Sequence, residues 1–360
     1  MSNDQKLYIA GIGMITPIGA NTLMTAASVR AGISGYKASD FFNQENEPYT
    51  MAELPPLVYS SLPVEIDEGA YYSELYDRVI KMAIIAASEA LSQQTIEKPV
   101  PLILGMAENI ASIKNIPLET LTTNLVNQAR LPIDPAQIRS IHTGRASGIE
   151  ALDLAHRYLY ELQQDFVLIG ASDSYWNFSI IKHLEQTQRL LAPGVQNGFA
   201  GGEGSGFLLL TRHPQKAINN NNSIVGLSLP GLSEEPGHFY SDKPYRGDGL
   251  SEAFRQAFRD YSGDPIKAVY GSMNGENYWV KEYGVAMTRN HSFFDEKVEH
   301  EHPADCYGDM GAATGPILMG LAAQGLLKQA RGLATYLVYS SSDGSWRAAV
   351  RLEKIAFNMK

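Results

Sequence analysis

The residues best placed for chemistry lie in the segment Gln137–Leu162, at the start of a helix predicted from Ala146 onward. Residues 137–143 alternate in character, which permits a strand, and a Gly-containing turn follows. From Ala146 onward, apolar residues recur at three- and four-residue spacing, which predicts a helix with a buried face. The free N–H groups and the dipole at a helix start stabilise an anion by about 0.3–1 kcal/mol, which would favour a thiolate or oxyanion. This start carries Arg145, which cannot be a nucleophile because its guanidinium stays protonated.

Histidines form a second group that merits a chemical interpretation. His300 and His302 alternate with two glutamates in segment 299–302, and this spacing would place both rings on one side of a strand. A metal site is therefore one interpretation, and a solvated charged loop is the interpretation that we favour. His142 and His156 are interpreted as structural histidines.

Composition limits the classes of function. The chain has 360 residues, of which 44% are hydrophobic, so it can form two core-forming units or one large one. Its net charge is -10 and its Lys and Arg residues are scattered, which argues against a nucleic-acid partner. No apolar stretch approaches the length of a membrane span and no signal peptide is indicated, so we expect a cytoplasmic protein. The single cysteine, Cys306, excludes an intrachain disulfide and a multi-cysteine metal site.

The elements that would position this chemistry recur in two halves. In the first half, the predicted strands and helices are 7–14, 21–29, 77–91, 100–106, 118–129 and 166–170. Residues 36–65 lack a clear period and are interpreted as a surface excursion. Four asparagines at 219–222 indicate a linker. In the second half, the predicted elements are 224–229, 251–261, 268–271, 311–327, 333–339 and 347–352. We therefore predict an N-terminal half, 1–218, and a C-terminal half, 223–360, joined by the loop 219–222.

Three segments, in this order, resemble motifs of the β-ketoacyl-acyl-carrier-protein synthases, which are thiolase-fold condensing enzymes. They are residues 13–19 (GMITPIG), 143–148 (TGRASG) and 197–210 (NGFAGGEGSGFLLL). The family has Gly-Met-Val-Thr-Pro-Leu-Gly, Thr-Ala-Cys-Ala/Ser-Ser/Thr-Gly and Asp-Gly-Phe-x-x-Gly-Glu-Gly-Ala-Gly at these places. The resemblance implies an α/β fold, a thiolase-like five-layer αβαβα sandwich built from two pseudo-duplicated halves.

The resemblance also implies where the catalytic side chains would lie, and all four are replaced. The nucleophilic cysteine matches Arg145. The first histidine, in Ala-His-Gly-Thr-Gly-Thr, matches Ser272. The lysine and the second histidine, in Lys-Ser-x-x-Gly-His, match Ala304 and Asp309.

Positions that bind substrate in the family have changed as well. The two threonines that contact the pantetheine arm match Asn274 and Glu276. The Gly-Phe-Gly-Gly loop that gates the acyl pocket matches residues 341–344 (SSDG). We therefore assign no catalytic residue, and we expect neither a cofactor nor a metal.

The replaced residues suggest a salt bridge. If the fold matches, Arg145 and Asp309 occupy neighbouring positions and fill the former active site, with Glu276 as a candidate second partner. Removing one member of such a buried pair costs about 3–5 kcal/mol because it leaves the other charge stranded. The alternative is that these are drifted residues in a closed pocket.

Two other residues are candidate nucleophiles. Cys306 lies away from the helix start that activates a thiol, so we favour an inert, packed cysteine. Ser147 lies at the helix start, but the resemblance places no histidine or lysine beside it as a base.

The leading hypothesis for function is a ketosynthase-like pseudoenzyme that binds or scaffolds. The resemblance implies a homodimer formed through the strand near residues 138–143. It also implies an active ketosynthase or an acyl carrier protein as a partner, because chain-length factors lack the cysteine and pair with an active ketosynthase. The competing hypothesis is a divergent acyltransferase or 3-oxoacyl-acyl-carrier-protein synthase that acts on acyl thioesters. A binding module in an unrelated process is a third class.

Overall fold

The strands of the first half form a mixed sheet. The computed structural model describes residues 5–64, 70–110, 113, 115–328 and 332–358. The strands of this sheet are β1 (Leu7–Ile15), β4 (Val100–Gly105), β5 (Ile133–Ile141), β6 (Phe166–Ser174) and β7 (Gly201–Thr211). Their order is β5-β4-β6-β7-β1, with β4 parallel to β5 and β6, and β7 antiparallel to β6 and β1.

The second half repeats this order and these directions. Its strands are β8 (Ser223–Leu227), β10 (Ile266–Gly271), β11 (Phe294–Glu301), β12 (Thr335–Ser341) and β13 (Trp346–Ala356). The order is β11-β10-β12-β13-β8, with β10 parallel to β11 and β12, and β13 antiparallel to β12 and β8. The short strand β9 (Gly231–Glu234) pairs with β13. β1 and β8 pair antiparallel and join the two sets of strands. The predicted division at 219–222 falls between β7 and β8 and stays a prediction.

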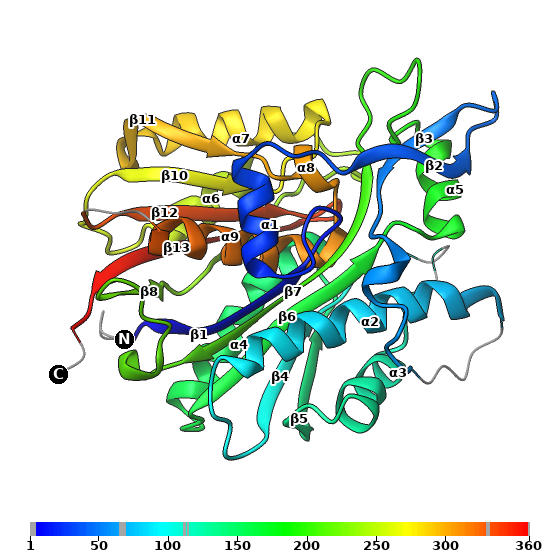
Figure 1. The fold of residues 1–360 in the computed structure, drawn as a ribbon. Coiled ribbons are helices and arrows are strands. Elements are labelled where there is room, and N and C mark those ends of the chain that lie inside the picture. Colours follow the sequence, from blue (N-terminus) through cyan, green and yellow to red (C-terminus); the bar gives the residue numbers. More distant parts are fainter. Residues whose placement is uncertain (1–4, 65–69, 111–112, 114, 329–331, 359–360) are drawn as a thin grey trace.

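Helices form three layers around the strands (Figure 1). α4 (Ser147–Tyr160) and α9 (Thr314–Lys328) lie in the central layer, where they share one apolar core with residues of both halves of the sheet. α2 (Ala70–Ser92) covers the outer face of the first-half strands. α6 (Asp248–Ala257) and α7 (Asn277–Arg289) cover the outer face of the second-half strands. This arrangement confirms the predicted α/β class with five layers.

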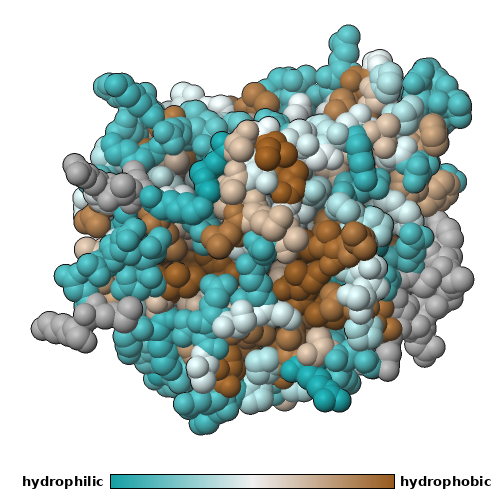
Figure 2. All heavy atoms as spheres, in the orientation of Figure 1, coloured by the Kyte–Doolittle hydropathy of each residue, from teal (hydrophilic) through white to brown (hydrophobic). Residues whose placement is uncertain are grey.

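Shorter elements complete the chain. They are α1 (Thr22–Arg30), the hairpin β2 (Tyr36–Phe42) and β3 (Pro48–Ala52), α3 (Leu118–Thr123), α5 (Phe178–Gln186) and α8 (Ala304–Tyr307). The face drawn in Figure 1 is mostly hydrophilic, and apolar residues show in separate areas across its middle (Figure 2). No helix in the described ranges is long and apolar enough to cross a membrane.

Several sequence-based predictions of elements were wrong. Residues 36–65 contain the β2–β3 hairpin, and β3 also pairs with β7, so long-range pairing supplies the order that the local pattern lacks. β5 begins at Ile133, four residues before the predicted strand, and includes Pro135. A proline is tolerated there because β5 is an edge strand. The segment with His300 and His302, interpreted as a loop, is largely the edge strand β11.

Candidate functional site

Arg145 lies in the sharp turn between β5 and α4. A 3-10 turn, Gly144–Ala146, leads directly into α4, and Gly144 has a left-handed φ of +60°. A Cβ atom at Gly144 would approach Cγ of Glu108 to 2.8 Å, so only glycine fits without a shift. The turn thus points Arg145 into the interior, where 4% of the residue is exposed.

Two carboxylates neutralise Arg145. Its Nε donates to Asp309 Oδ2 at 2.8 Å, and its Nη1 donates to Asp343 Oδ1 at 2.6 Å. Its Nη2 lies 2.5 Å from Asp309 Oδ2 and 3.4 Å from the hydroxyl of Tyr175. Burial alone would lower the pKa of Arg145, but the charges of Asp309 and Asp343 outweigh burial and raise it well above its usual value. The predicted ion pair between Arg145 and Asp309 is therefore present.

The predicted role of Glu276 as a second partner of Arg145 is wrong. Glu276 binds Arg189, whose Nε and Nη2 donate to its two oxygens at 2.7 and 2.8 Å. Arg189 also donates from Nη1 to Asp343 Oδ2 at 2.6 Å, so Asp343 bridges two guanidiniums. Together these guanidiniums hold the pKa of Asp343 well below its usual range, although burial acts in the opposite direction.

Arg189 and Asp343 were missed by the sequence reasoning. Asp343 lies in segment 341–344, which was matched to a family loop but given no chemical role. Arg189 follows α5 in a segment without periodicity, and it pairs with residues 87 and 154 positions away. Such distant partners leave no local signal in a sequence.

The other matched positions gather around Asp309. Asn274 Nδ2 donates to Asp309 Oδ2 at 2.8 Å and lies 3.2 Å from Glu276 Oε2. Ser272 and Ala304 line a small cavity together with Asp309, with about 210 Å³ of empty space. Ser272 Oγ accepts the backbone N–H of Ser341 at 3.0 Å. The structure thus brings all six matched positions into one region.

The N–H group at the start of α4 is already occupied. Ala146 N donates to Ser342 Oγ at 3.0 Å, and the Ser342 hydroxyl donates in turn to the carbonyl of Thr143. Ser147 is fully buried, and its Oγ has no hydrogen-bond partner among the described residues. No base among the described residues is therefore hydrogen-bonded to Ser147 to activate it.

The surroundings of Cys306 and His300 in the described part of the chain do not favour a nucleophile or a metal site. Burial and the charge of Asp305 raise the pKa of the Cys306 thiol, which disfavours the reactive thiolate. His300 Nδ1 lies 2.6 Å from the hydroxyl of Tyr283. Within the described ranges, no group of three or more His, Cys, Asp or Glu side chains is placed to hold a metal ion. His142 is exposed, and its Nε2 lies 3.2 Å from the hydroxyl of Ser140.

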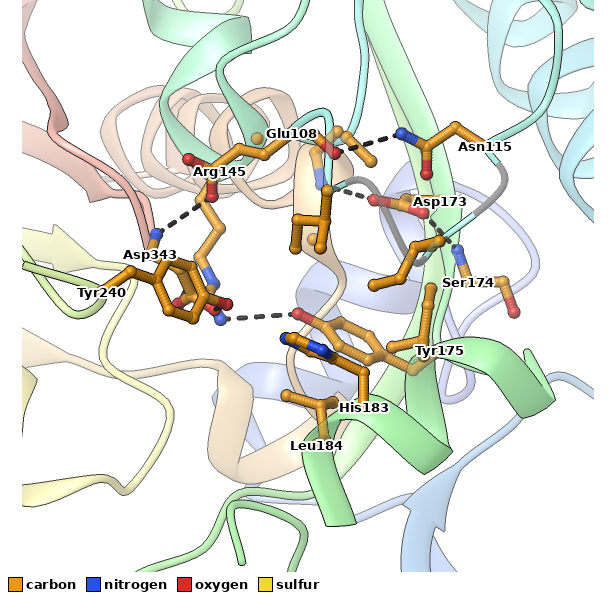
Figure 3. Close-up of a pocket in the computed structure, with 17 residues that line it drawn as sticks. Glu108, Asn115, Arg145, Asp173, Ser174, Tyr175, His183, Leu184, Tyr240 and Asp343 are labelled. Carbon is orange, nitrogen blue, oxygen red and sulfur yellow. Dashed lines mark hydrogen bonds and ion pairs between the residues drawn. The ribbon is translucent and has the colours of Figure 1, made fainter. Parts of the chain in front are cut away.

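A pocket lies against the Arg145 network and encloses about 580 Å³ of empty space, part of it open to solvent. Figure 3 shows Asp343 and Tyr240 on one side of it, Asp173 and Ser174 on the other, and Tyr175 reaching toward Arg145. Apolar side chains complete the wall: Ala107, Ile110, Ile113, Ile180, Leu184 and Ala312. α5 supplies Ile180 and Leu184.

Two carboxylates in this pocket have backbone N–H partners. Glu108 accepts the N–H groups of Asp343 and Gly344 at 3.1 and 3.0 Å. Asp173 accepts those of Ala312 and Ser174, each at 2.9 Å. Burial raises the pKa of Asp173 to about 6, and burial together with the charge of Asp343 raises that of Glu108.

Solved structures share this fold, although no protein-family model and no curated protein matches the chain. The ishigamide ketosynthase/chain length factor has a TM-score of 0.74 at 16% identity, covering 99% of this chain and 100% of that chain. The ketosynthase ApeO in complex with its chain length factor ApeC, from Xenorhabdus doucetiae, has a TM-score of 0.71 at 16% identity, covering 97% and 98%.

A third match is a type II acyl-carrier protein in complex with its ketosynthase bound to the hexaketide, AntDE:AntF. Its TM-score is 0.74 at 15% identity, covering 97% of this chain and 99% of that chain. Identities this low establish a shared fold and nothing finer. The chain therefore has the thiolase-like α/β fold of ketosynthases and chain length factors, as its motifs predicted.

Proposed function

We propose that this chain is a ketosynthase-like protein without condensing activity that works by binding a protein partner. The observation that carries this proposal is the buried ion pair of Arg145 with Asp309 at the positions matched to the nucleophile and a catalytic histidine. A condensing enzyme needs a thiolate and neutral hydrogen-bond donors at these positions. A protonated guanidinium offers no lone pair for attack, and an ionised carboxylate offers no proton to an oxyanion.

An active ketosynthase is the partner that we propose. β5 is the last strand at its end of the sheet, and Pro135, Ala136 and Arg139 on it are exposed. At the opposite end, β11 is protected by charged side chains along FDEKVEHE. The less charged β5 edge is suited to pair with a strand of another chain. Among the solved structures of this fold, a ketosynthase occurs with its chain length factor and another with its acyl-carrier protein.

Intact-mass measurement tests the absence of covalent chemistry. The wild-type chain is incubated with acyl-CoA and with acyl-loaded carrier protein, alongside Arg145→Cys. We expect no acyl adduct on the wild type. An adduct on the wild type would overturn the proposal, whereas one on Arg145→Cys alone would indicate that the pocket still admits the thioester.

Light scattering coupled to size-exclusion chromatography tests the partner. The chain is run alone and with a co-expressed ketosynthase, and we expect a one-to-one complex in the mixture. Ala136→Asp places a charge on the exposed β5 edge and should abolish the complex, whereas Lys297→Asp on β11 serves as the matched control. A homodimer that excludes the ketosynthase would replace this partner with a second copy of the chain.

The second candidate is a divergent enzyme that acts on acyl thioesters. The pocket beside Arg145 favours it, because a space of about 580 Å³, part of it open to solvent, reaches Arg145 at the position matched to the nucleophile. Release of free CoA or carrier thiol from the acylated forms, followed with a thiol reagent, would support this candidate. Loss of that release in Asp173→Asn would place the reaction in the pocket.

A further inference from the structure

Among the described residues, those around the pocket beside Arg145 carry an excess of negative charge. Arg145 and Asp343 line the pocket, and in the ion network to which they belong the carboxylates of Asp309, Asp343 and Glu276 face two guanidiniums. Glu108 and Asp173 add two further carboxylates to the pocket wall. Neither forms an ion pair with a described residue, and their hydrogen bonds come from backbone N–H groups. A ligand that carried negative charge would meet this field at close range.

Arg145 contributes one positive charge at the pocket wall, but its N–H groups are not free to bind an anionic ligand. Its nitrogens are engaged by Asp309, Asp343 and Tyr175, and it is 4% exposed. A carboxylate or phosphate ligand would have to displace one of these buried carboxylates to reach the guanidinium. Leaving a buried carboxylate unpaired is costly, so the pocket disfavours anions.

Aromatic and aliphatic groups line the remainder of the pocket. The rings of Tyr175, Tyr240 and His183 face it, with those of His183 and Tyr240 edge to face at 6.3 Å. Aromatic faces attract an ammonium group, and the effect adds to that of nearby carboxylates. Ile113, Leu184 and the other apolar side chains offer a surface for an aliphatic or aryl body.

We propose that this pocket binds an organic cation, a primary or secondary ammonium carried on a short apolar chain or ring. The negative charges of Glu108 and Asp173 attract the ammonium, Tyr175 and Tyr240 provide aromatic faces, and the isoleucines with Leu184 hold the apolar body. A bare metal ion fits less well, because no group of three candidate ligands is placed around a common point in the described ranges. The inference concerns a ligand of the isolated chain, so it is independent of pairing with a ketosynthase.

Calorimetric titration with three probes of similar shape tests which ligand charge the pocket prefers. The probes are hexylammonium chloride, hexan-1-ol and sodium hexanoate, each titrated into the full chain in phosphate buffer free of amines. We expect hexylammonium to bind at least about tenfold more tightly than hexanol, and hexanoate to give no heat of binding. Equal binding of hexanoate and hexylammonium, or no binding of any probe, would overturn the proposal.

Variants then locate the site. Glu108→Gln and Asp173→Asn should each weaken hexylammonium binding about tenfold or more. Glu150→Gln is the matched control, because Glu150 is a half-buried carboxylate outside this pocket that accepts the Thr143 hydroxyl at 2.6 Å. Tyr240, which is 45% exposed, permits a change that spares the core: Tyr240→Ala should weaken binding, whereas Tyr240→Phe should keep most of it. Unchanged affinity in Tyr240→Ala and both carboxylate variants would contradict the assignment. Complex formation with a ketosynthase is measured separately by light scattering, so a failure of the ligand proposal can be told from a failure of the partner proposal.

Discussion

The two central helices, α4 and α9, begin with the same backbone geometry, but the carboxylates that lie beside their first residues have different partners. Each follows a 3-10 turn, Gly144–Ala146 or Gly311–Ala313, whose glycine has a left-handed φ of +60° or +51°. Asp343 faces the start of α4 and is bound by two guanidiniums. Asp173 faces the start of α9 and accepts only backbone N–H groups in the described part of the chain.

The difference shows what is needed to keep a buried carboxylate ionised. Two guanidiniums lower the pKa of Asp343 well below its usual range despite its burial. Two backbone N–H groups do not offset the burial of Asp173, whose pKa rises to about 6. The fold therefore places similar carboxylates at its two helix starts and gives them opposite responses to pH.

Removing the guanidinium at α4 should have the largest effect. Arg145→Ala leaves Asp309 and Asp343 without one of their counter-charges and should lower the free energy of unfolding by about 3–5 kcal/mol. Urea denaturation measures this change. Arg157→Ala, on the exposed side of the same helix, is the control and should cost less than about 0.5 kcal/mol. Similar losses in the two variants would contradict the importance of the buried pair.

Removing the charge of Asp343 should have the next largest effect. Asp343→Asn weakens one hydrogen bond of Arg145 and two of Arg189 while Asp309 and Glu276 remain, so we expect a loss of about 3 kcal/mol in the free energy of unfolding at pH 7. Because the pKa of Asp343 is lower in the folded state, this stabilisation is present above about pH 4 and is lost as the pH falls below it. The difference in stability between wild type and variant should therefore narrow from pH 5 to pH 2. A constant difference would contradict the lowered pKa.

Asp173→Asn should show the opposite trend with pH. The pKa of Asp173 is raised in the folded state, so its favourable contribution is complete below about pH 4 and is lost as the pH rises through about 6. From pH 4 to pH 7, the variant should gain about 2–3 kcal/mol relative to the wild type. Thermal or urea unfolding across this range measures the trend. A difference in stability between variant and wild type that did not change with pH would mean that the pKa of Asp173 is not raised by folding.

Replacing each of the two turn glycines with alanine should give the smallest difference in stability between the two helix starts. A Cβ at Gly311 would approach Asp173 Oδ2 to 2.2 Å, whereas one at Gly144 meets Glu108 Cγ at 2.8 Å. Both changes also force alanine into a left-handed conformation, which costs about 1 kcal/mol. We expect Gly311→Ala to be the more destabilising by about 1 kcal/mol, because it disturbs a carboxylate that binds the start of α9. The opposite order in melting temperatures would contradict this account of the α9 start.

The fold was largely predictable because its signals are local. The apolar runs at 7–14, 100–106 and 166–170 and the helix after Ala146 are recognisable from periodicity, and each corresponds to an observed element. The hairpin at 36–52 was not predicted, because its strands are ordered by pairing with each other and with β7 rather than by alternation. The same cause hid β11, whose charged sequence resembles a loop until its pairing with β10 is known.

The sequence by itself predicted a ketosynthase-like fold, which the solved structures confirm, and its motifs predict that Arg145 and Asp309 occupy the positions matched to catalytic residues. These conclusions follow from residue types at fixed spacing along the chain. The tertiary structure alone decided which charges meet. In the folded chain, Asp343 forms ion pairs with both Arg145 and Arg189, and Glu276 forms an ion pair with Arg189. Glu108 and Asp173 accept hydrogen bonds from backbone N–H groups. The sequence could not predict these partners, because contacts between distant segments depend on packing in three dimensions.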